Sequence, residues 1–494
     1  MNRPIVRLYG LILLLFALVI WKTSQWAVFD AGALQDKPQN RRPLIEDQTV
    51  KRGTITTADG VVVAASHPEG GGSNPVYVRS YPQGSLFGHP VGYSYINVGQ
   101  TGIERAENGV LSGEENEFAS ILDELRGRPQ AGSSIQLTID AHAQQVATQA
   151  LENAIASTPG ASGHGGAVVA IVPQTGAVRV MASVPGYDPN AVKETRTFRR
   201  LNRDPLAPLF NRATQATYPP GSTMKVVTAA AALDSGRFTP GSVLSGASPQ
   251  LIGGAPLSNA GGEQFGNIDM TTALTYSVNT YFAQVGEQLG TGTMVEYMKR
   301  FGFYKDPELA YPGDEMAPSG PYNSAGKLVT SGFDVGRVAI GQGGAEGQDL
   351  VTPLQMAEVA ATVANGGKLM KPQLVQRVTD PDGRVTDTLK PEVQSVAIKP
   401  QTAAELKQMM LNVTQAPEAT GAGLTVNGQP FPGKTGTAEI DVQAGINQPW
   451  FIAFAPADNP QIAVAATIER CTGCFGAQVA GPIAVQVMDA LLGG

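Results

Sequence analysis

Residues 218–233 read YPPGSTMKVVTAAAAL, and the rest of the chain is best understood from this stretch. Two prolines and a glycine interrupt whatever structure comes before, and an alanine-rich run with strong helix propensity follows. The sequence therefore predicts that Ser222 lies in the first turn of a helix, near backbone N–H groups and the positive end of the helix dipole. Lys225 comes three residues later, so it is predicted on the same helix face.

These two side chains have the parts of an acylating enzyme. A serine hydroxyl becomes a strong nucleophile when a base removes its proton, and an amine is such a base when burial or a nearby cation lowers its pKa. The Ser-x-x-Lys pattern alone is weak, because it is expected about once by chance in a chain of this size. Ser324 and Lys327 repeat it, but a glycine lies between them and no helical run follows. We interpret that second copy as a loop.

Length, charge and composition limit the function. The 494 residues are enough for two or three domains, and the net charge of −7 argues against nucleic acid as a partner. All four histidines precede Ser222, so a Ser-His-Asp triad is open in chain order, although no histidine lies in a recognisable motif. Two cysteines, Cys471 and Cys474, are too few for a structural zinc site.

The amino terminus predicts a membrane anchor. Arg3 and Arg7 precede or flank an uncharged apolar run, and residues 5–21 form a plausible spanning helix if Arg7 extends its charge to the interface. The alternative is a cleaved signal peptide, because residues 31–33 read AGA, but this pattern lies far from the apolar run. We expect residues 1–34 to be a cytoplasmic tail, a signal-anchor and a linker. Both interpretations export the rest of the chain.

The exported part is predicted to divide at residue 140. Residues 35–140 hold short β-like pieces between glycine-rich turns, without acid–base or metal chemistry, which predicts a small β-rich pedestal or dimerisation-like module. In residues 141–494, strands near both ends enclose a mostly helical section, which predicts an α+β domain with one antiparallel sheet flanked by helices. The predicted strands are 166–172, 177–182, 434–440, 450–455 and 461–469, and the predicted helices are 226–233, 270–276, 280–289, 353–364, 403–414 and 482–492.

A second short motif lies between two predicted helices. Residues 275–280 read TYSVNT, which places a hydroxyl at Ser277 and an amide at Asn279. Taken alone, these two residues are explained most simply by a turn and a helix N-cap.

A third motif opens a predicted strand, where residues 432–439 read PGKTGTAE. Lys434 supplies a cation, and Thr435 and Thr437 supply hydroxyls on the same side of the strand. Gly436 would let a ligand approach the backbone closely. Taken alone, this segment is also compatible with an ordinary edge strand.

In this order, the three motifs resemble the set found in penicillin-binding proteins and serine β-lactamases. The motifs are Ser222-x-x-Lys225, Ser277-x-Asn279 and Lys434-Thr435-Gly436. The anchor and several further segments are similar to class B penicillin-binding proteins, the peptidoglycan D,D-transpeptidases, nearest to the short PbpA-like members of actinobacteria. Those segments are residues 52–55 (RGTI), 137–140 (LTID), 340–343 (IGQG), 351–357 (VTPLQMA) and 450–456 (WFIAFAP).

The resemblance implies a reaction at Ser222. The substrate would be a peptidoglycan stem peptide ending in D-Ala-D-Ala, and Ser222 would attack its penultimate carbonyl while Lys225 takes the proton. The backbone N–H groups of Ser222 and Thr437 would hold the oxyanion. Ser277 would relay a proton to the leaving D-Ala, and Asn279 would orient the substrate and Lys225. A β-lactam would be trapped at the acyl stage.

The resemblance also implies how the substrate is held and what the protein works with. Lys434, Thr435 and Thr437 would bind the terminal carboxylate, with Gly436 in the same strand, and Lys434 would keep Lys225 deprotonated by charge repulsion. An amine of a neighbouring stem peptide would accept the acyl group, and no metal or cofactor is required. The implied partners are the cytoplasmic membrane and a glycan polymerase of the SEDS type.

Four alternatives bear on the same motifs. A serine β-lactamase must deacylate rapidly, but its usual Glu-x-x-x-Asn run is absent between Asn279 and Lys434. A D,D-carboxypeptidase, which uses water instead of an amine, is not excluded by the motifs. A β-lactam sensor would need a multi-span signalling region. A non-catalytic wall-binding scaffold would not need three intact motifs.

The two cysteines are expected to form a disulfide. Cys471 and Cys474 follow a predicted strand, and Thr472 and Gly473 between them can make a tight turn. Export places them in an oxidising compartment, and metal binding would need two further ligands.

Overall fold

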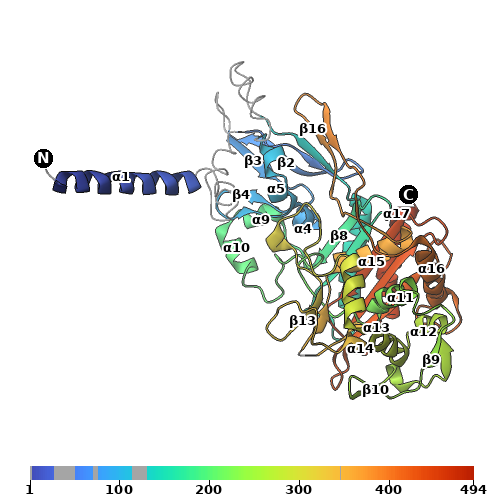
Figure 1. The fold of residues 1–494 in the computed structure, drawn as a ribbon. Helices are drawn as coiled ribbons and strands as arrows, with labels where there is room; N and C mark the ends of the chain where they lie inside the picture. Colours follow the sequence, from blue (N-terminus) through green and yellow to red (C-terminus); the bar gives the residue numbers. More distant parts are fainter. Residues whose placement is uncertain (1–2, 27–49, 70–75, 114–130, 345, 494) are drawn as a thin grey trace.

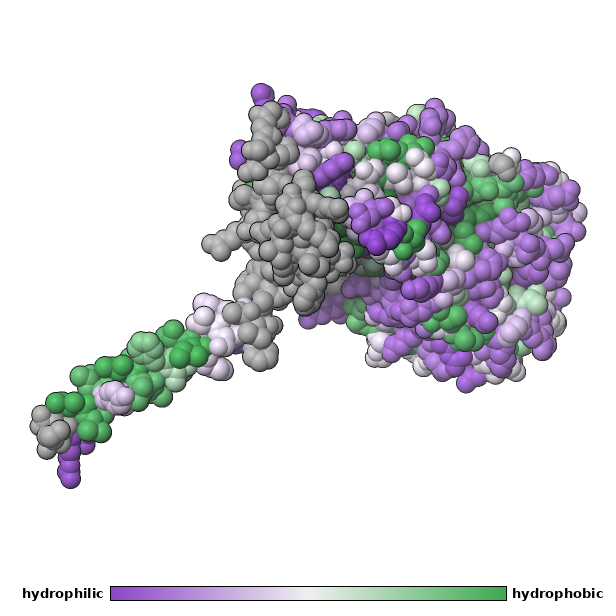
Figure 2. Space-filling view, turned by 90° about the horizontal axis from the view of Figure 1, so that it is seen from above, coloured by the Kyte–Doolittle hydropathy of each residue, from purple (hydrophilic) through white to green (hydrophobic). Residues whose placement is uncertain are grey.

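The structure is a computed structural model, and it describes residues 3–26, 50–69, 76–113, 131–344 and 346–493. Helix α1 (Arg3–Ser24) carries apolar side chains around its whole circumference, and none of them is buried (Figure 2). It is the one helix among the described residues that is long and apolar enough to cross a membrane. The predicted cleavage-like pattern at 31–33 lies outside the described residues.

The amino-terminal module after α1 is built on a six-stranded sheet in the order β17-β16-β6-β1-β2-β3. Its strands are β1 (Ile55–Thr56), β2 (Val62–Glu69), β3 (Val76–Ser80), β6 (Ser134–Leu137), β16 (Val375–Thr379) and β17 (Val385–Thr388). The last two come from far along the chain, and Figure 1 shows orange β16 beside the blue strands. A fragment that begins at Ala141 would therefore leave the edge of β16 open, a feature that promotes aggregation.

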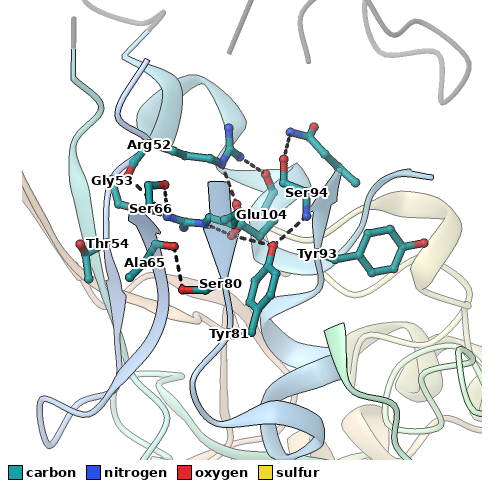
Figure 3. Close-up of polar contacts among 12 residues, drawn as sticks. Arg52, Gly53, Thr54, Ala65, Ser66, Ser80, Tyr81, Tyr93, Ser94 and Glu104 are labelled. Atoms are coloured by element: carbon teal, nitrogen blue, oxygen red, sulfur yellow. Dashed lines mark hydrogen bonds and ion pairs between the residues drawn. The ribbon is translucent and has the colours of Figure 1, made fainter. Parts of the chain in front are cut away.

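A buried charge network fastens the start of this module. Glu104 is fully buried, and its carboxylate accepts from Nε of Arg52 at 2.7 Å and from Nε of Arg79 at 2.6 Å (Figure 3). The hydroxyl of Tyr81 donates to the same carboxylate at 3.2 Å. Burial by itself would raise the pKa of Glu104, but the two guanidinium groups outweigh it and hold that pKa below its usual value. The contact explains why an arginine precedes the first strand.

The second sheet forms the centre of the larger domain, and all its strand pairs are antiparallel, as predicted. The order is β19-β20-β21-β7-β8, with β22 paired to β20. The strands are β7 (Gly166–Ile171), β8 (Val178–Val184), β19 (Gly433–Asp441), β20 (Ile446–Ala455), β21 (Ile462–Ile468) and β22 (Cys471–Thr472).

Helices cover both faces of this sheet. Along β21, Ile462, Val464 and Ala466 pack with α8 (Ala141–Ser157) and α17 (Gly476–Leu492), whereas the alternate residues face the other helices. That alternation follows from the two-residue period of a strand, and burial on both faces explains why β7 and β21 are almost wholly apolar. The helices on the second face are α11 (Lys225–Asp234), α12 (Met270–Thr275), α13 (Asn279–Arg300), α15 (Pro353–Ala364) and α16 (Pro400–Gln415).

The predicted strands and long helices are confirmed, although several bounds differ, such as the start of β20, which lies at Ile446 and not at residue 450. Residues Gly221–Met224 form a 3₁₀ turn, η5, and the α-helix begins at Lys225 instead of Ser222. Helix α13 continues to Arg300 across a break at Gly290, where φ is 75°. Helix α17 begins before the predicted start and contains Pro482.

Short elements complete the fold. Among the described residues there are five two-stranded ribbons: β4 (Ser94–Tyr95) with β5 (Gly99–Gln100), β9 (Val243–Ser245) with β12 (Asn267–Asp269), β10 (Gln250–Ile252) with β11 (Ala255–Leu257), β13 (Gly320–Tyr322) with β14 (Gln348–Leu350), and β15 (Lys368–Met370) with β18 (Val393–Val396). The short helices are η3 (Gly84–Phe87), α4 (Gly88–Val91), α5 (Gly102–Ala106), α6 (Asn108–Ser112), α9 (Pro189–Val192), α10 (Thr195–Leu201), η6 (Ala260–Gly262), η7 (Gly313–Glu315) and α14 (Val335–Val338).

Cys471 and Cys474 are joined by a disulfide in the structure, with their Cα atoms 5.9 Å apart. The bond closes the turn after β22, which pairs with β20 of the second sheet. Because the closed loop is so short, its chain-entropy contribution is about 2 kcal/mol at most. We expect the double variant Cys471→Ser and Cys474→Ser to lower the melting temperature modestly and to retain most penicillin acylation. Two alkylated thiols in exported, non-reduced protein, measured by mass spectrometry, would contradict the bond.

Candidate active site

The turn that carries Ser222 is held from three sides. The Gly221 N–H donates to the carbonyl of Gly341 at 3.0 Å, and the Trp450 indole donates to the carbonyl of Pro219 at 2.9 Å. Thr223 donates to the carbonyl of Pro220 at 2.7 Å, which closes the 3₁₀ turn. Ser222 itself is half-buried, whereas the residues around it are buried. The nucleophile candidate is therefore fixed in its backbone and still open to solvent.

Glycines from three segments allow this close packing. A Cβ added to Gly221 (φ +52°) would lie 3.0 Å from the Ala438 nitrogen, and one added to Gly341 would lie 2.0 Å from the Gly221 oxygen. A Cβ on Gly436 would lie 2.9 Å from the Pro220 oxygen and 2.8 Å from Trp450 Cβ. The Cβ side of Gly436 is thus filled by the chain's own atoms, so a glycine at this position lets strand β19 pack closely against the Ser222 turn.

Lys225 is fully buried and points to the second motif. Its Nζ donates to the Ser277 carbonyl at 2.6 Å, to Ser277 Oγ at 3.2 Å and to Asn279 Oδ1 at 2.6 Å. Burial holds the pKa of Lys225 well below its usual value, and the nearby charge of Lys434 lowers it further. No hydrogen bond reaches Ser222 Oγ within the described residues, which is common for catalytic contacts before substrate binds.

Ser277 lies in a left-handed conformation, with φ +59°, between α12 and α13. For a non-glycine residue this conformation costs on the order of 1–3 kcal/mol and is concentrated at functional sites. It directs both the carbonyl and the hydroxyl of Ser277 to buried lysines. The predicted turn at Ser277 is confirmed, but Asn279 is the first residue of α13 and not its cap, which is Val278. The Asn279 amide instead accepts from Lys225 and donates to the Ser258 carbonyl.

The lysine of the third motif reaches the same hydroxyl. Nζ of Lys434 lies 2.9 Å from Ser277 Oγ and 3.0 Å from the Thr435 carbonyl, and the residue is fully buried. Burial lowers the pKa of Lys434 to about 7. In the described part of the chain no carboxylate forms an ion pair with Lys225 or Lys434. Two buried amines without a counter-ion favour the neutral state of at least one of them.

The two threonine hydroxyls of the third motif have different partners. Thr435 Oγ1 lies 2.9 Å from Oγ1 of Thr420, and the Thr437 hydroxyl accepts from the Gly476 N–H at 3.2 Å. Strand β19 is an edge strand, so one row of its backbone groups is left for the Ser222 turn and for a ligand. Thr420 lies outside every motif, and no pattern in the sequence singled it out.

Neither the second Ser-x-x-Lys copy nor a Ser-His-Asp triad forms a site in the structure. Ser324 and Lys327 are exposed in a turn after β13, so the interpretation of this copy as a loop is confirmed. None of the four histidines hydrogen-bonds to Ser222, and the most buried, His89, packs at the module border with its pKa lowered to about 3 by burial. The structure therefore brings together Ser222, Lys225, Ser277, Asn279, Lys434, Thr435, Gly436 and Thr437, but no Ser-His-Asp triad.

The buried amine of Lys434 predicts a pH dependence of stability. Its pKa is about 7 in the fold and near 10.5 when unfolded, so the unfolded chain binds more protons between these values. The free energy of unfolding should therefore rise with pH across this window, by up to about 1.4 kcal/mol per pH unit from this group. Lys434→Met should reduce the slope of the free energy of unfolding against pH. Urea unfolding of both proteins at pH 7.5, 8.5 and 9.5 measures it, and equal slopes would contradict the assignment.

Comparison with known proteins places this geometry in a family. A family model described as the penicillin binding protein transpeptidase domain matches residues 166–489. A second model, described as the penicillin binding protein A dimerisation domain, matches residues 52–135. The first match contains all three motifs, and the second contains the Arg52–Glu104 network.

Similar proteins extend over the full length of the chain. The peptidoglycan D,D-transpeptidase PbpA of Mycolicibacterium smegmatis is 34% identical over 512 residues, covering 100% of this chain and 99% of that protein. The PbpA of Mycobacterium tuberculosis is 32% identical over 513 residues, covering 100% of both. The solved structure of M. tuberculosis penicillin-binding protein A as a ceftriaxone acyl-enzyme complex has a TM-score of 0.78 and 32% identity, covering 91% of this chain and 100% of that one. With these matches and this site, the chain belongs to the penicillin-binding proteins that carry a transpeptidase domain.

Proposed function

We propose that this chain is a peptidoglycan D,D-transpeptidase that cross-links stem peptides through an acyl-enzyme on Ser222. The observation that supports it most is the meeting of three distant segments at one hydroxyl, Ser277 Oγ, which contacts Lys225 at 3.2 Å and Lys434 at 2.9 Å. The full-length relatives named above are D,D-transpeptidases, and the M. tuberculosis protein is solved as β-lactam acyl-enzymes.

The first half-reaction follows from the position of the amines. Lys225, held neutral by burial, takes the proton of Ser222 as Oγ attacks the penultimate D-Ala carbonyl. The N–H groups of Ser222 and Thr437 stabilise the oxyanion. When the peptide C–N bond breaks, the proton passes from Lys225 through Ser277 Oγ to the nitrogen of the leaving D-Ala. Asn279 keeps Lys225 aimed at this relay.

The carboxylate of the terminal D-Ala binds at the third motif. Lys434 supplies a positive charge, and Thr435 and Thr437 supply hydroxyl donors. Gly436 lets this strand pack closely against the turn that carries Ser222. An anion near Lys434 raises its pKa from the value of about 7 in the empty site and so favours its charged form. The charged Lys434 in turn keeps Lys225 neutral. Binding of the substrate carboxylate thus favours a charged Lys434 and a neutral Lys225, which are the protonation states that acylation needs.

In the second half-reaction an amine from a neighbouring stem peptide attacks the acyl-enzyme, and Ser222 is released. A β-lactam ring presents a similar carbonyl and carboxylate, so it acylates Ser222 and is retained. Cell wall synthesis during growth or division is the setting, without metal or cofactor.

The proposed location is supported by α1, which is long and apolar enough to cross a membrane. Arg3 and Arg7 before the apolar run favour a cytoplasmic amino terminus, with residues 35–494 outside the cytoplasmic membrane on a single span. We propose a SEDS-type glycan polymerase as the partner that supplies the strands to be cross-linked, with the pedestal and anchor holding the two proteins side by side. A mature amino terminus near residue 34, found by sequencing the exported protein, would contradict the retained anchor.

A product assay tests the proposal. The full chain in detergent is mixed with uncross-linked glycan carrying pentapeptide stems, together with an amine acceptor. We expect cross-linked or acceptor-bearing muropeptides with release of D-Ala, and none of either with Ser222→Ala. Tetrapeptide as the sole product would instead identify a D,D-carboxypeptidase, and fast turnover of penicillin would identify a β-lactamase. Labelling by penicillin without any peptide product would leave the scaffold alternative as the better account.

A further inference from the structure

The hydroxyl of Thr435 has a protein partner outside the three motifs. Its Oγ1 is 2.9 Å from Oγ1 of Thr420, in the segment between α16 and β19, and Lys434 Nζ donates to it at 3.4 Å. Thr435 is nearly buried, and Thr420 is half-buried. We infer that Thr420 is a positioning residue for the terminal carboxylate of the substrate and acts through the hydroxyl of Thr435. The inference rests on the carboxylate-binding role proposed above for Thr435.

The backbone around Thr420 is fixed by the second motif. The N–H and the hydroxyl of Thr420 both lie 3.4 Å from the carbonyl of Thr275, the last residue of α12. On the other side, the Gly421 N–H donates to the carbonyl of Val413 in α16 at 3.0 Å. Thr420 therefore bridges strand β19 to the end of the helix that leads into Ser277. Its hydroxyl lies within hydrogen-bond distance of Thr435 Oγ1 in the third motif and of the Thr275 carbonyl.

The direction of the hydroxyl hydrogens decides what Thr435 can bind. A hydroxyl has one hydrogen to donate, whereas a carboxylate only accepts. In the structure Thr435 donates to Thr420, so its hydrogen is not directed at the substrate. When a carboxylate binds, Thr435 must turn its hydrogen to it, and the contact with Thr420 then needs a hydrogen from Thr420.

Thr420 can make that exchange at low cost. If its hydroxyl turns to Thr435, the Thr275 carbonyl keeps the Thr420 N–H as a partner. The result is a chain of donors from Thr420 to Thr435 to the carboxylate, in which each hydrogen bond strengthens the next. Without the Thr420 hydroxyl, the buried Thr435 Oγ1 would keep only the long contact from Lys434 Nζ, at 3.4 Å, as a donor among the described residues.

Three substitutions separate this role from a packing role. Thr420→Val keeps the branched shape but has no hydroxyl, and Thr420→Ala removes the hydroxyl with less bulk. Thr420→Ser keeps the hydroxyl. The full chain in detergent is acylated with benzylpenicillin and with its methyl ester, which has the same ring but no carboxylate charge. The ratio of the two second-order rate constants reports carboxylate recognition alone.

We expect Thr420→Val and Thr420→Ala to lower the acid-to-ester ratio by about tenfold, the effect of one weakened charge-assisted hydrogen bond. Thr420→Ser should restore the ratio to within about twofold of the native value. Because Thr420 acts through Thr435, the double variant Thr420→Val with Thr435→Val should match Thr435→Val alone.

A native ratio in both Thr420→Val and Thr420→Ala would overturn the inference. Equal slowing of acid and ester would also overturn it, since that is the result of a general structural defect. So would independent, multiplying effects in the double variant. If Thr435→Val itself kept the native ratio, the fault would lie in the proposed carboxylate site and not in the link to Thr420, so the two failures are distinguishable.

Discussion

Ser222→Ala is expected to abolish covalent labelling by a fluorescent penicillin, because it removes the one hydroxyl that the Pro-Pro-Gly turn presents between Lys225 and strand β19. The protein should still fold, since Ser222 is half-buried and its side chain makes no hydrogen bond within the described residues. Labelling is measured on gels after denaturation, and the melting temperature is measured in parallel.

The chain contains its own matched control. Ser324→Ala removes the serine of the second Ser-x-x-Lys copy, which lies in an exposed turn, and should leave labelling nearly unchanged. Labelling that survives Ser222→Ala and is lost in Ser324→Ala would reverse the assignment of the nucleophile.

Lys225→Met is expected to slow acylation by about 10³-fold, within the range found for removal of a general base. Methionine fills a similar volume, and the substitution removes an amine that is fully buried without a carboxylate partner among the described residues. The free energy of unfolding should change little, because relief from burying the amine is offset by the loss of the donor to the Ser277 carbonyl and Asn279 Oδ1. Lys327→Met, in the exposed second copy, is the matched control and should have almost no effect on the rate. A Lys225→Met rate within tenfold of the native rate would show that another group takes the proton.

The pH profile of acylation adds a test of how Lys225 is tuned. Since the pKa of Lys225 is held well below its usual value by burial and by Lys434, the native rate should approach its plateau well below pH 10.5. In Lys434→Met the cationic neighbour is gone, so the pKa of Lys225 should rise and the acidic limb should move to higher pH. An unshifted limb, measured from pH 5.5 to 10 by stopped-flow acylation, would exclude the charge of Lys434 as a cause.

Much of the larger domain is predictable because its elements are locally encoded. Strand β7 and residues 450–455 of β20 are apolar runs that end just before a proline, and β21 is apolar except for Thr467. Helix α15 runs from Pro353 to a glycine-rich end, as its residues indicate. The three motifs were predictable as a set in order, although each by itself has an ordinary structural explanation.

Other features depend on contacts that local sequence does not encode. Strands β16 and β17 are mostly exposed, so no burial pattern marks them as part of this sheet. Strand β16 pairs with β6, which lies more than two hundred residues earlier, and β17 pairs with β16. Thr420 gives no signal, because its role comes from a tertiary contact with Thr435. The α-helix starts at Lys225 instead of Ser222 because Gly221, packed against Gly341 and Ala438, imposes a tighter turn than helix propensity alone predicts.

Peptide mapping of the penicillin-modified chain tests the central claim most directly. The full chain is acylated with benzylpenicillin, denatured and digested with trypsin, which places Ser222 in residues 213–225 and Ser324 in residues 306–327. We predict that the mass of the intact penicilloyl group appears on the peptide 213–225 and that fragmentation places it on Ser222. An adduct on any other residue, or no adduct in a folded chain, would contradict the account.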